Sequence, residues 1–287
     1  MITPLPVAGW SLPTTATTVG INSETTFLTF LSLSFSSSIE PNKTWGIKIF
    51  RTTKEVVKTA KRRKNSSTRW LQRQINDPYV RQAQAEGRRS RAAYKIIQID
   101  EKFNIFKKGN SVLDLGAAPG SWTEVAIDRA GGVIVAVDIL EMEDIKNAII
   151  IKADLSDENS SNLIKKLNNE KFDIVLSDMA ASTTGHKQTD HIRTQALAEL
   201  AASYAVEFLK PGGVFCAKVF QGGTHGDLLH NLKSNFKLIK HFKPDASRKG
   251  SPETYVIAKD FKGWFLNYKN LFELISGYVI SRRQQPI

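Results

Sequence analysis

Apolar runs of strand length alternate with longer amphipathic stretches from about residue 66 to residue 260. This alternation is typical of a parallel sheet whose strands are joined by crossover helices, because such strands are buried on both faces. It predicts one α/β domain built on a doubly wound, Rossmann-like sheet of seven mostly parallel strands with helices on both faces. The candidate strands are Ser111–Asp114, Val133–Asp138, Ile149–Asp154, Phe172–Asp178, Val214–Phe220, Phe236–Phe242 and Tyr255–Ala258.

Two of the amphipathic stretches, Ser121–Ala130 and His191–Leu209, are predicted to form helices. Lys-Pro-Gly-Gly follows the second stretch at residues 210–213. We expect its proline and glycines to end that helix before the next strand begins.

Four of the candidate strands end in an aspartate. In open α/β sheets, ligands bind beyond the carboxyl ends of the strands. One such aspartate alone is equally consistent with a helix cap. Four of them on the same edge predict a polar or cationic ligand there. They are Asp114, Asp138, Asp154 and Asp178.

A small-residue loop, Gly-Ala-Ala-Pro-Gly from Gly116 to Gly120, follows the first candidate strand. Such a loop turns tightly and lets the backbone approach a ligand closely. Its spacing differs from the Gly-x-Gly-x-x-Gly dinucleotide pattern, and it lacks the Gly-Lys-Ser/Thr of a Walker loop. Asp138 lies about 20 residues further on, where a ribose-binding carboxylate is expected. The pattern predicts a nucleoside-bearing cofactor without a diphosphate, and S-adenosylmethionine (SAM) fits that description.

Lys218 lies in a candidate strand that is otherwise suited to burial. A buried ammonium group costs several kcal/mol unless it is paired, and Asp178 is its natural partner. Lys95 and Glu253 each look like surface residues by themselves, but together with this pair they form a candidate site. No metal is expected, because Cys216 is the only cysteine and the five histidines show no ligand spacing.

Positive charge is concentrated in one segment. Residues 41–95 hold 16 Lys/Arg and 3 Asp/Glu, whereas the remaining residues hold 24 and 25. Such a segment predicts a nucleic-acid partner, with an anionic membrane surface as the alternative. We therefore expect a basic nucleic-acid-binding arm at 41–95 that leads into a SAM-dependent domain at 66–260.

The two ends of the chain differ from this domain in composition. Residues 1–40 are rich in Ser and Thr and contain no Lys or Arg, so we expect a disordered extension. Residues 261–287 are expected to form an amphipathic helical tail that packs onto the domain. No uncharged apolar run reaches the roughly 18 residues that a membrane span requires. The single cysteine fits a reducing compartment. A bacterial cytoplasm is the expected location, with a mitochondrial location as the alternative.

From about Trp70 to Lys259 the sequence resembles the FtsJ/RrmJ (RlmE) family of ribosomal RNA large-subunit 2′-O-ribose methyltransferases. The chain has Pro-Gly-Ser121-Trp where the family often has Pro-Gly-Gly-Trp, and both middle residues are small, so little change is expected. The resemblance is carried by Arg-Ser-Arg-Ala-Ala-Tyr-Lys95, Asp114-Leu-Gly-Ala-Ala-Pro-Gly120, Leu176-Ser-Asp178-Met-Ala, Lys218-Val-Phe and Ser-Pro-Glu253.

This resemblance implies a SAM-dependent RNA (uridine-2′-O-)-methyltransferase with a Lys-Asp-Lys-Glu tetrad around the reacting hydroxyl. Lys218 then either removes the proton of that hydroxyl or orients it. The implied tetrad is Lys95, Asp178, Lys218 and Glu253. The implied SAM contacts are Gly120 and Trp122 on the methionine portion, Asp138 on the ribose hydroxyls, Asp154 on the adenine amino group, and Asp178.

The resemblance also implies a substrate, a uridine in the A-loop of large-subunit (23S) ribosomal RNA within the large ribosomal subunit. A monomer without membrane contact is expected, with Arg88, Arg89 and Arg91 holding phosphates of the RNA. Two alternatives stay open. One is a 2′-O-methyltransferase that acts on tRNA or capped mRNA, and the other is a non-catalytic RNA-binding factor for ribosome assembly.

Overall fold

The computed structural model describes residues 55–57, 65–168, 170–221 and 226–263. The chain divides into two units, and all of these residues belong to the second, Thr53–Ile287. The expected extension at 1–40, the start of the basic arm and nearly all of the expected tail at 261–287 lie outside the described residues, so those three expectations remain predictions.

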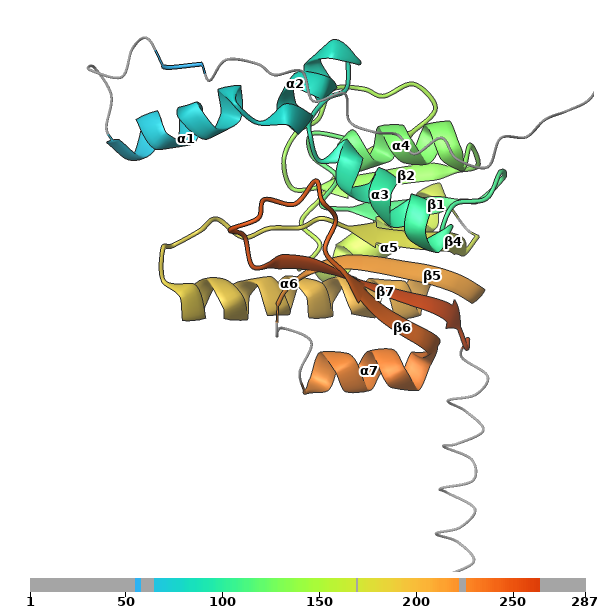
Figure 1. Ribbon diagram of the computed structural model, residues 1–287. Coiled ribbons are helices and arrows are strands. Elements are labelled where there is room, and N and C mark those ends of the chain that lie inside the picture. The colour runs from blue at the N-terminus through green and yellow to red at the C-terminus, as the bar shows by residue number, and fades with distance from the viewer. Residues whose placement is uncertain (1–54, 58–64, 169, 222–225, 264–287) are drawn as a thin grey trace, which may run out of the picture. The chain divides into compact units, whose positions relative to one another are not determined.

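Seven strands form one sheet in the order β3-β2-β1-β4-β5-β7-β6 (Figure 1). Strands β1 to β5 run parallel, whereas β7 is antiparallel to both β5 and β6. The predicted seven-stranded, mostly parallel sheet is therefore confirmed. The strands are β1 (Val112–Leu115), β2 (Ile134–Asp138), β3 (Ile149–Lys152), β4 (Phe172–Ser177), β5 (Leu209–Phe220), β6 (Phe236–Phe242) and β7 (Glu253–Phe261).

Helices pack on both faces of the sheet. Figure 1 shows helices on both sides of the sheet. Successive side chains of a strand point to opposite faces, so Val112 belongs to the buried cluster that includes side chains of α3 and α4, whereas Leu113 belongs to the cluster that includes side chains of α5, α6 and α7. Within the described residues, no helix has both the length and the apolar content to cross a membrane. The helices are α1 (Asn65–Ile75), α2 (Pro78–Ala85), α3 (Ala93–Phe103), α4 (Ser121–Arg129), α5 (Glu158–Leu167), α6 (Lys187–Phe208) and α7 (Asp227–Asn235).

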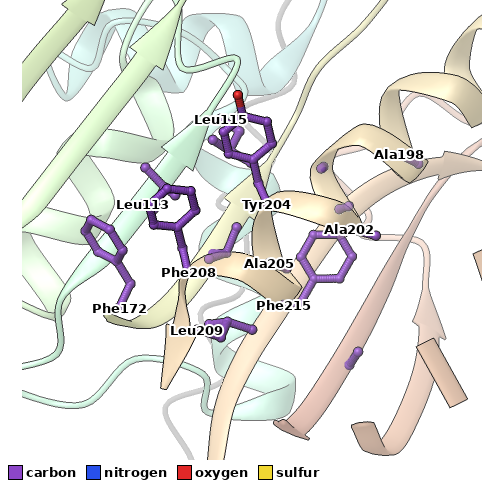
Figure 2. Packing of buried hydrophobic residues seen from close by; sticks show 14 of the residues in the cluster. Leu113, Leu115, Phe172, Ala198, Ala202, Tyr204, Ala205, Phe208, Leu209 and Phe215 are labelled. Atoms are coloured by element: carbon purple, nitrogen blue, oxygen red, sulfur yellow. The ribbon is translucent and has the colours of Figure 1, made fainter. Parts of the chain in front are cut away.

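Aromatic side chains attach α6 to the sheet (Figure 2). The ring of Phe208 lies 6.4 Å from that of Phe172 on β4 and 5.9 Å from that of Tyr204 on α6, measured between centroids. Both of its partners are buried, as is Leu113 on β1. Aromatic pairs at these separations add to the stability that burial provides. This packing holds β1, β4 and α6 in a fixed relation.

The largest displacements of predicted boundaries are at the starts of α6 and β5. Helix α6 begins at Lys187 rather than His191, because Asp190 in its first turn accepts hydrogen bonds from the preceding Thr184 and Gly185 backbone. Strand β5 begins at Leu209 rather than Val214. Its pairing with β4 shifts across the Lys-Pro-Gly-Gly segment, which therefore interrupts the strand instead of separating it from the helix.

Candidate active site

Four charged side chains from four different elements converge at the carboxyl edge of the sheet. Asp178 directly follows β4, and Lys218 lies two residues before the end of β5. Because β7 is antiparallel, its first residue, Glu253, pairs with Phe220, the last residue of β5, and so reaches the same edge. Lys95 comes from the first turn of α3.

The four side chains form one continuous network of opposite charges. Lys95 Nζ lies 3.3 Å from Asp178 Oδ2 and 2.9 Å from Glu253 Oε1. Lys218 Nζ donates to Asp178 Oδ1 at 3.0 Å and to the Asp178 carbonyl oxygen at 2.7 Å. The structure thus brings together all four residues of the expected tetrad, and Asp178 stands between the two lysines.

The network is largely shielded from solvent, since the Lys218 side chain is only 6% exposed. Its charges therefore shift one another's pKa values. Burial raises the pKa of Asp178, but the ammonium groups of Lys218 and Lys95 outweigh that effect and bring it below its ordinary value. Burial likewise lowers the pKa of Lys95, and the carboxylates of Asp178 and Glu253 outweigh it, so the net direction is upward. Asp178 is therefore an anion and Lys95 a cation at neutral pH.

Tyr255 is a member of this site that our sequence analysis treated only as part of a strand. Its hydroxyl donates to Asp178 Oδ1 at 2.8 Å and lies 3.0 Å from Glu253 Oε1, and its ring is fully buried. Burial and the two carboxylates raise its pKa well above the ordinary value, so it remains a neutral donor. The sequence feature that could have identified Tyr255 is its position two residues after Glu253 in a strand, because the side chains of such residues point to the same face of the sheet.

Ser247, in the connection between β6 and β7, also contacts the network. Its hydroxyl donates to Glu253 Oε1 at 2.8 Å. Glu253 Oε1 thus has three partners, from α3, β7 and this connection. The carboxylate is fixed from three directions, which limits its rotation.

The glycine loop lies beside this network, after β1. Gly116 has φ +71° and Gly120 has φ +97°, a left-handed backbone that residues with a side chain rarely adopt. A Cβ atom would collide with Met179 at the first position and with Ile145 at the second. Gly120 is also the N-cap residue of α4. Both positions require glycine, and the loop presents backbone next to the carboxyl edge.

Asp138, the last residue of β2, holds this loop in place. Its Oδ2 accepts a hydrogen bond from the Ala118 backbone at 2.9 Å, and its Oδ1 accepts one from Leu140 at 2.7 Å. Each carboxylate oxygen retains a second lone pair for a ligand. Asp138 can therefore hold the loop in place and, at the same time, accept a hydrogen bond from a hydroxyl group of a ligand.

The other two expected cofactor residues have different surroundings. Asp154, two residues beyond β3, is exposed, and the pKa of its carboxyl is lowered by hydrogen bonds from the side chain and backbone of Ser156. Trp122 is buried, and its Nε1 donates to the Ala92 carbonyl at 3.0 Å. Its ring packs 5.6 Å from that of Tyr255. The indole therefore contacts both the start of α3, through Ala92, and the charged network, through Tyr255.

Asp114 lies within β1 rather than at its end, and it is fully buried. Burial is the main cause that raises the pKa of its carboxyl from 3.8 to about 7, and the nearby charges of Asp178 and Asp138 add to it. The Thr123 hydroxyl donates to its Oδ2 at 2.7 Å. Of the four expected strand-ending aspartates, only Asp138 is the last residue of its strand.

Strand order arranges these groups along the edge. Asp154, Asp138 and the glycine loop follow β3, β2 and β1, which are neighbours, whereas the charged network belongs to β4, β5 and β7. One half of the edge therefore suits an elongated ligand, and the other half holds the reactive charges. Within the part of the chain that the structure describes, no group of three or more His, Cys, Asp or Glu side chains is placed to hold a metal ion.

The three arginines expected to hold phosphates are also paired within the protein. Arg88 lies 3.2 Å from Asp128, and Arg89 lies 3.3 Å from Glu124. Arg91 forms an ion pair with Asp77 and donates to the Ala246 carbonyl. These contacts join the segment between α2 and α3 to α4 and to the β6–β7 connection. Phosphate contact by the three arginines remains a prediction.

A Rossmann-like sheet with a glycine loop after its first strand, and with a Lys-Asp-Lys-Glu network at the carboxyl edge, is the arrangement of a methyltransferase. Residues 88–261 match the family model described as FtsJ-like methyltransferase. The chain belongs to this family of enzymes.

Curated relatives and a solved structure agree with this assignment. The chain is 57% identical over 209 residues to the ribosomal RNA large subunit methyltransferase E of Maricaulis maris, covering 73% of this chain and 75% of the relative. It is 54% identical over 213 residues to the protein of the same name from Rhodospirillum rubrum, covering 72% and 81%. A crystal structure of a ribosomal RNA methyltransferase from Plasmodium falciparum superposes with a TM-score of 0.55 at 31% identity, over 61% of this chain and 99% of that one.

Proposed function

We propose that this enzyme transfers a methyl group from SAM to the 2′-hydroxyl of a uridine in the A-loop of 23S ribosomal RNA. The observation that carries the proposal is the position of Lys218, whose ammonium group is fixed by two acceptors of Asp178 beside the glycine loop. The name of the relatives, ribosomal RNA large subunit methyltransferase E, supports the choice of substrate.

SAM fits the residues along the β3–β2–β1 half of the edge. Its sulfonium group supplies an electrophilic methyl group and its adenosine carries no phosphate, which matches a loop without a diphosphate-binding pattern and with carboxylates around it. In this proposal Gly120 and Trp122 border the methionine portion, and Asp138 accepts from the ribose hydroxyls. Asp154 accepts from the adenine amino group, and Asp178 lies where the two halves of the edge meet.

Lys218 is proposed to hold the ribose hydroxyl. An ammonium group has three hydrogens, and two of those on Lys218 are directed at Asp178. The third would donate to the 2′-oxygen and stabilise the negative charge that develops there. SAM, when bound, would give up its methyl group to this oxygen and leave as a neutral thioether, and the hydroxyl proton would pass to water. Fixing the oxygen in line with the methyl group supplies much of the rate. Lys218 thus orients the nucleophile in this mechanism.

The remaining members of the network position Lys218. Lys95 and Tyr255 both contact the Asp178 carboxylate, which keeps it ionised and directed at Lys218. Glu253 in turn fixes Lys95 at 2.9 Å. Removing any one of them disturbs the position of Asp178, because the contacts are shared.

The proposal is tested by transfer of tritiated methyl from SAM to large ribosomal subunits, with the product mapped for 2′-O-methylation. Lys218→Ala should lower the rate by about 10²–10³-fold, the cost of losing one donor to a developing oxyanion. Lys210→Ala is the matched control. Lys210 lies in the same strand and is paired with Asp173 at 3.1 Å, but it is at the opposite edge of the sheet.

Each outcome of this experiment has a distinct meaning. Label on a single uridine ribose with wild type and Lys210→Ala, but not with Lys218→Ala, supports both substrate and mechanism. If Lys218→Ala labels the subunits as fast as wild type does, the proposed role of Lys218 is wrong, but the methyltransferase activity is still supported. If subunits stay unlabelled, tRNA and capped RNA are assayed next, and no transfer to any of them favours the non-catalytic RNA-binding factor.

The setting of the reaction belongs to the same proposal. We place the enzyme in the bacterial cytoplasm, where large ribosomal subunits are assembled, and as a monomer. The relatives come from bacteria, which supports this location. Sedimentation of the purified protein would test the monomeric state.

A further inference from the structure

The exposed face of helix α1 carries a tryptophan beside two arginines. Trp70 is 50% exposed, and Arg69 and Arg73 are exposed as well. At 100° per residue these three positions fall on one side of the helix. Arg73 Nε donates to the Arg69 carbonyl at 3.3 Å, which holds its guanidinium group on this side. We call these three residues the α1 face.

Side chains that flank the α1 face make contacts within the protein. Gln72 Oε1 accepts from the Val57 backbone at 3.0 Å, and Asn76, just after the helix, accepts from the Glu55 backbone at 2.9 Å. Val57 is itself buried. These contacts set the rotation of α1 about its axis, and the α1 face therefore points to solvent.

The composition of the sequence that includes α1 suits a polyanion. Residues 56 to 76 contain seven Lys/Arg and no Asp or Glu. A membrane-binding helix would need a broad apolar face, but Trp70 is the only large exposed apolar side chain on α1. An aromatic ring among cationic groups is the arrangement that single-stranded nucleic acid uses, since a base stacks on the ring while the cations contact the phosphates.

The α1 face is also connected to the catalytic edge. Arg248 Nη2, in the connection between β6 and β7, donates to Gln74 Oε1 on α1 at 3.1 Å. The neighbouring residue, Ser247, donates to Glu253 of the network. Figure 1 shows this connection rising from the sheet toward α1 and α2. A strand of RNA bound at the catalytic edge can therefore continue onto α1.

We propose that the α1 face is a docking surface for an unpaired stretch of the RNA substrate, with one base stacked on Trp70 and its flanking phosphates held by Arg69 and Arg73. The inference rests on the proposed function for its RNA substrate. It extends that function by assigning an RNA contact to α1, in addition to the contacts predicted for Arg88, Arg89 and Arg91.

The first test measures binding of a fluorescein-labelled oligouridine of about 12 nucleotides by anisotropy. Trp70→Ala should weaken binding by about 5- to 150-fold, the range that one base–aromatic stack supplies. Trp70→Phe should recover most of the affinity, because phenylalanine also stacks. Leu167→Ala, which shortens a 52% exposed apolar side chain on α5, is the matched control and should bind like wild type. Wild-type affinity in Trp70→Ala, or no recovery in Trp70→Phe, overturns the proposal.

Salt dependence separates stacking from phosphate contact. Arg73→Ala should lower the slope of log affinity against log salt by about 1, whereas Trp70→Ala should leave the slope unchanged. Equal slopes for wild type and Arg73→Ala would overturn the phosphate contact. Stronger effects of Trp70→Ala on binding to phosphatidylserine vesicles than on RNA would assign the α1 face to a membrane instead.

A second assay separates this inference from the proposed function. With large ribosomal subunits, Trp70→Ala should raise KM and leave kcat within about two-fold of wild type, because α1 does not contact the reacting atoms. SAM affinity, measured by calorimetry, should not change. If wild type binds RNA through Trp70 but transfers no methyl group, the proposed function fails and the docking surface stands. If wild type methylates and Trp70→Ala shows the same KM, the docking surface fails alone.

Discussion

Replacing Tyr255 with phenylalanine removes one hydroxyl from the centre of the charged network and leaves the buried ring in place. The hydroxyl donates to the Asp178 carboxylate at 2.8 Å and lies 3.0 Å from Glu253. Both acceptors remain after the substitution, and the Tyr255 side chain itself is fully buried. Asp178 keeps Lys95 and Lys218 as partners but loses its neutral donor.

The expected cost follows from the charge of the acceptor. A hydrogen bond to a charged group contributes about 1.5–3 kcal/mol to the free energy of unfolding, and one between neutral groups contributes about 0.5–1.5 kcal/mol. Tyr204 provides the neutral comparison, because its buried hydroxyl donates to the Leu155 carbonyl at 3.0 Å. Tyr255→Phe should therefore destabilise the protein by about 1–2 kcal/mol more than Tyr204→Phe does.

Urea unfolding followed by circular dichroism measures both variants at pH 7. The Tyr255 hydroxyl is one of the groups that lower the pKa of Asp178. Because that pKa is lowered, the ionised form of Asp178 contributes stability that is present above about pH 4 and is lost as the pH falls further. The cost of Tyr255→Phe should thus be constant from neutral pH down to about pH 5 and shrink below pH 4. An equal cost for the two tyrosine variants at pH 7 would refute the argument from the charged network.

Two further substitutions test the glycine loop and the buried aspartate. Gly120→Ala places a side chain at φ +97° against Ile145, so it should lower the free energy of unfolding by about 1–3 kcal/mol. It should also abolish SAM binding, measured by calorimetry. Gly250→Ala, whose added Cβ meets open space, is the control and should have neither effect. Wild-type SAM affinity in Gly120→Ala would contradict the role of the loop. Asp114 has a pKa raised from 3.8 to about 7, so its neutral form stabilises the fold and that contribution is lost as the pH rises from about 4 through 7. The asparagine of Asp114→Asn cannot ionise, so the free energy of unfolding of this variant should rise by a few kcal/mol relative to wild type between pH 5 and pH 8, measured by urea unfolding. A difference that does not depend on pH would show that Asp114 does not titrate in this range.

Much of the fold was predictable from local pattern. All seven predicted strands are present, since an apolar run of strand length between turn-forming residues has few other ways to bury its side chains. Boundaries were less predictable. The Lys-Pro-Gly-Gly segment at 210–213 has the composition of a break between a helix and a strand, yet residues on both sides of it pair with β4. The partner strand decides that outcome, and the partner is distant in the sequence.

The site shows the same division. Lys218 was recognisable from sequence because an ammonium group in a buried strand requires a partner, and the structure supplies Asp178. Tyr255 was not, because its role depends on two carboxylates that only the folded chain brings to its hydroxyl. The contacts of Arg91 were not predictable for a related reason, since nothing local to it reveals that Asp77 and the Ala246 carbonyl accept its hydrogen bonds.

By itself, the sequence determined the periodicity of the strands, the glycine loop, the charged residue types and the basic segment, because each of these depends on neighbours a few residues apart. Only the tertiary structure decided which charges neutralise one another. Glu253 reaches Lys95 because β7 runs antiparallel beside β5, and this reversal brings the start of the last strand to the end of an earlier one. Electrostatic energy depends on distance in space, and in this protein that distance is set by strand order and direction.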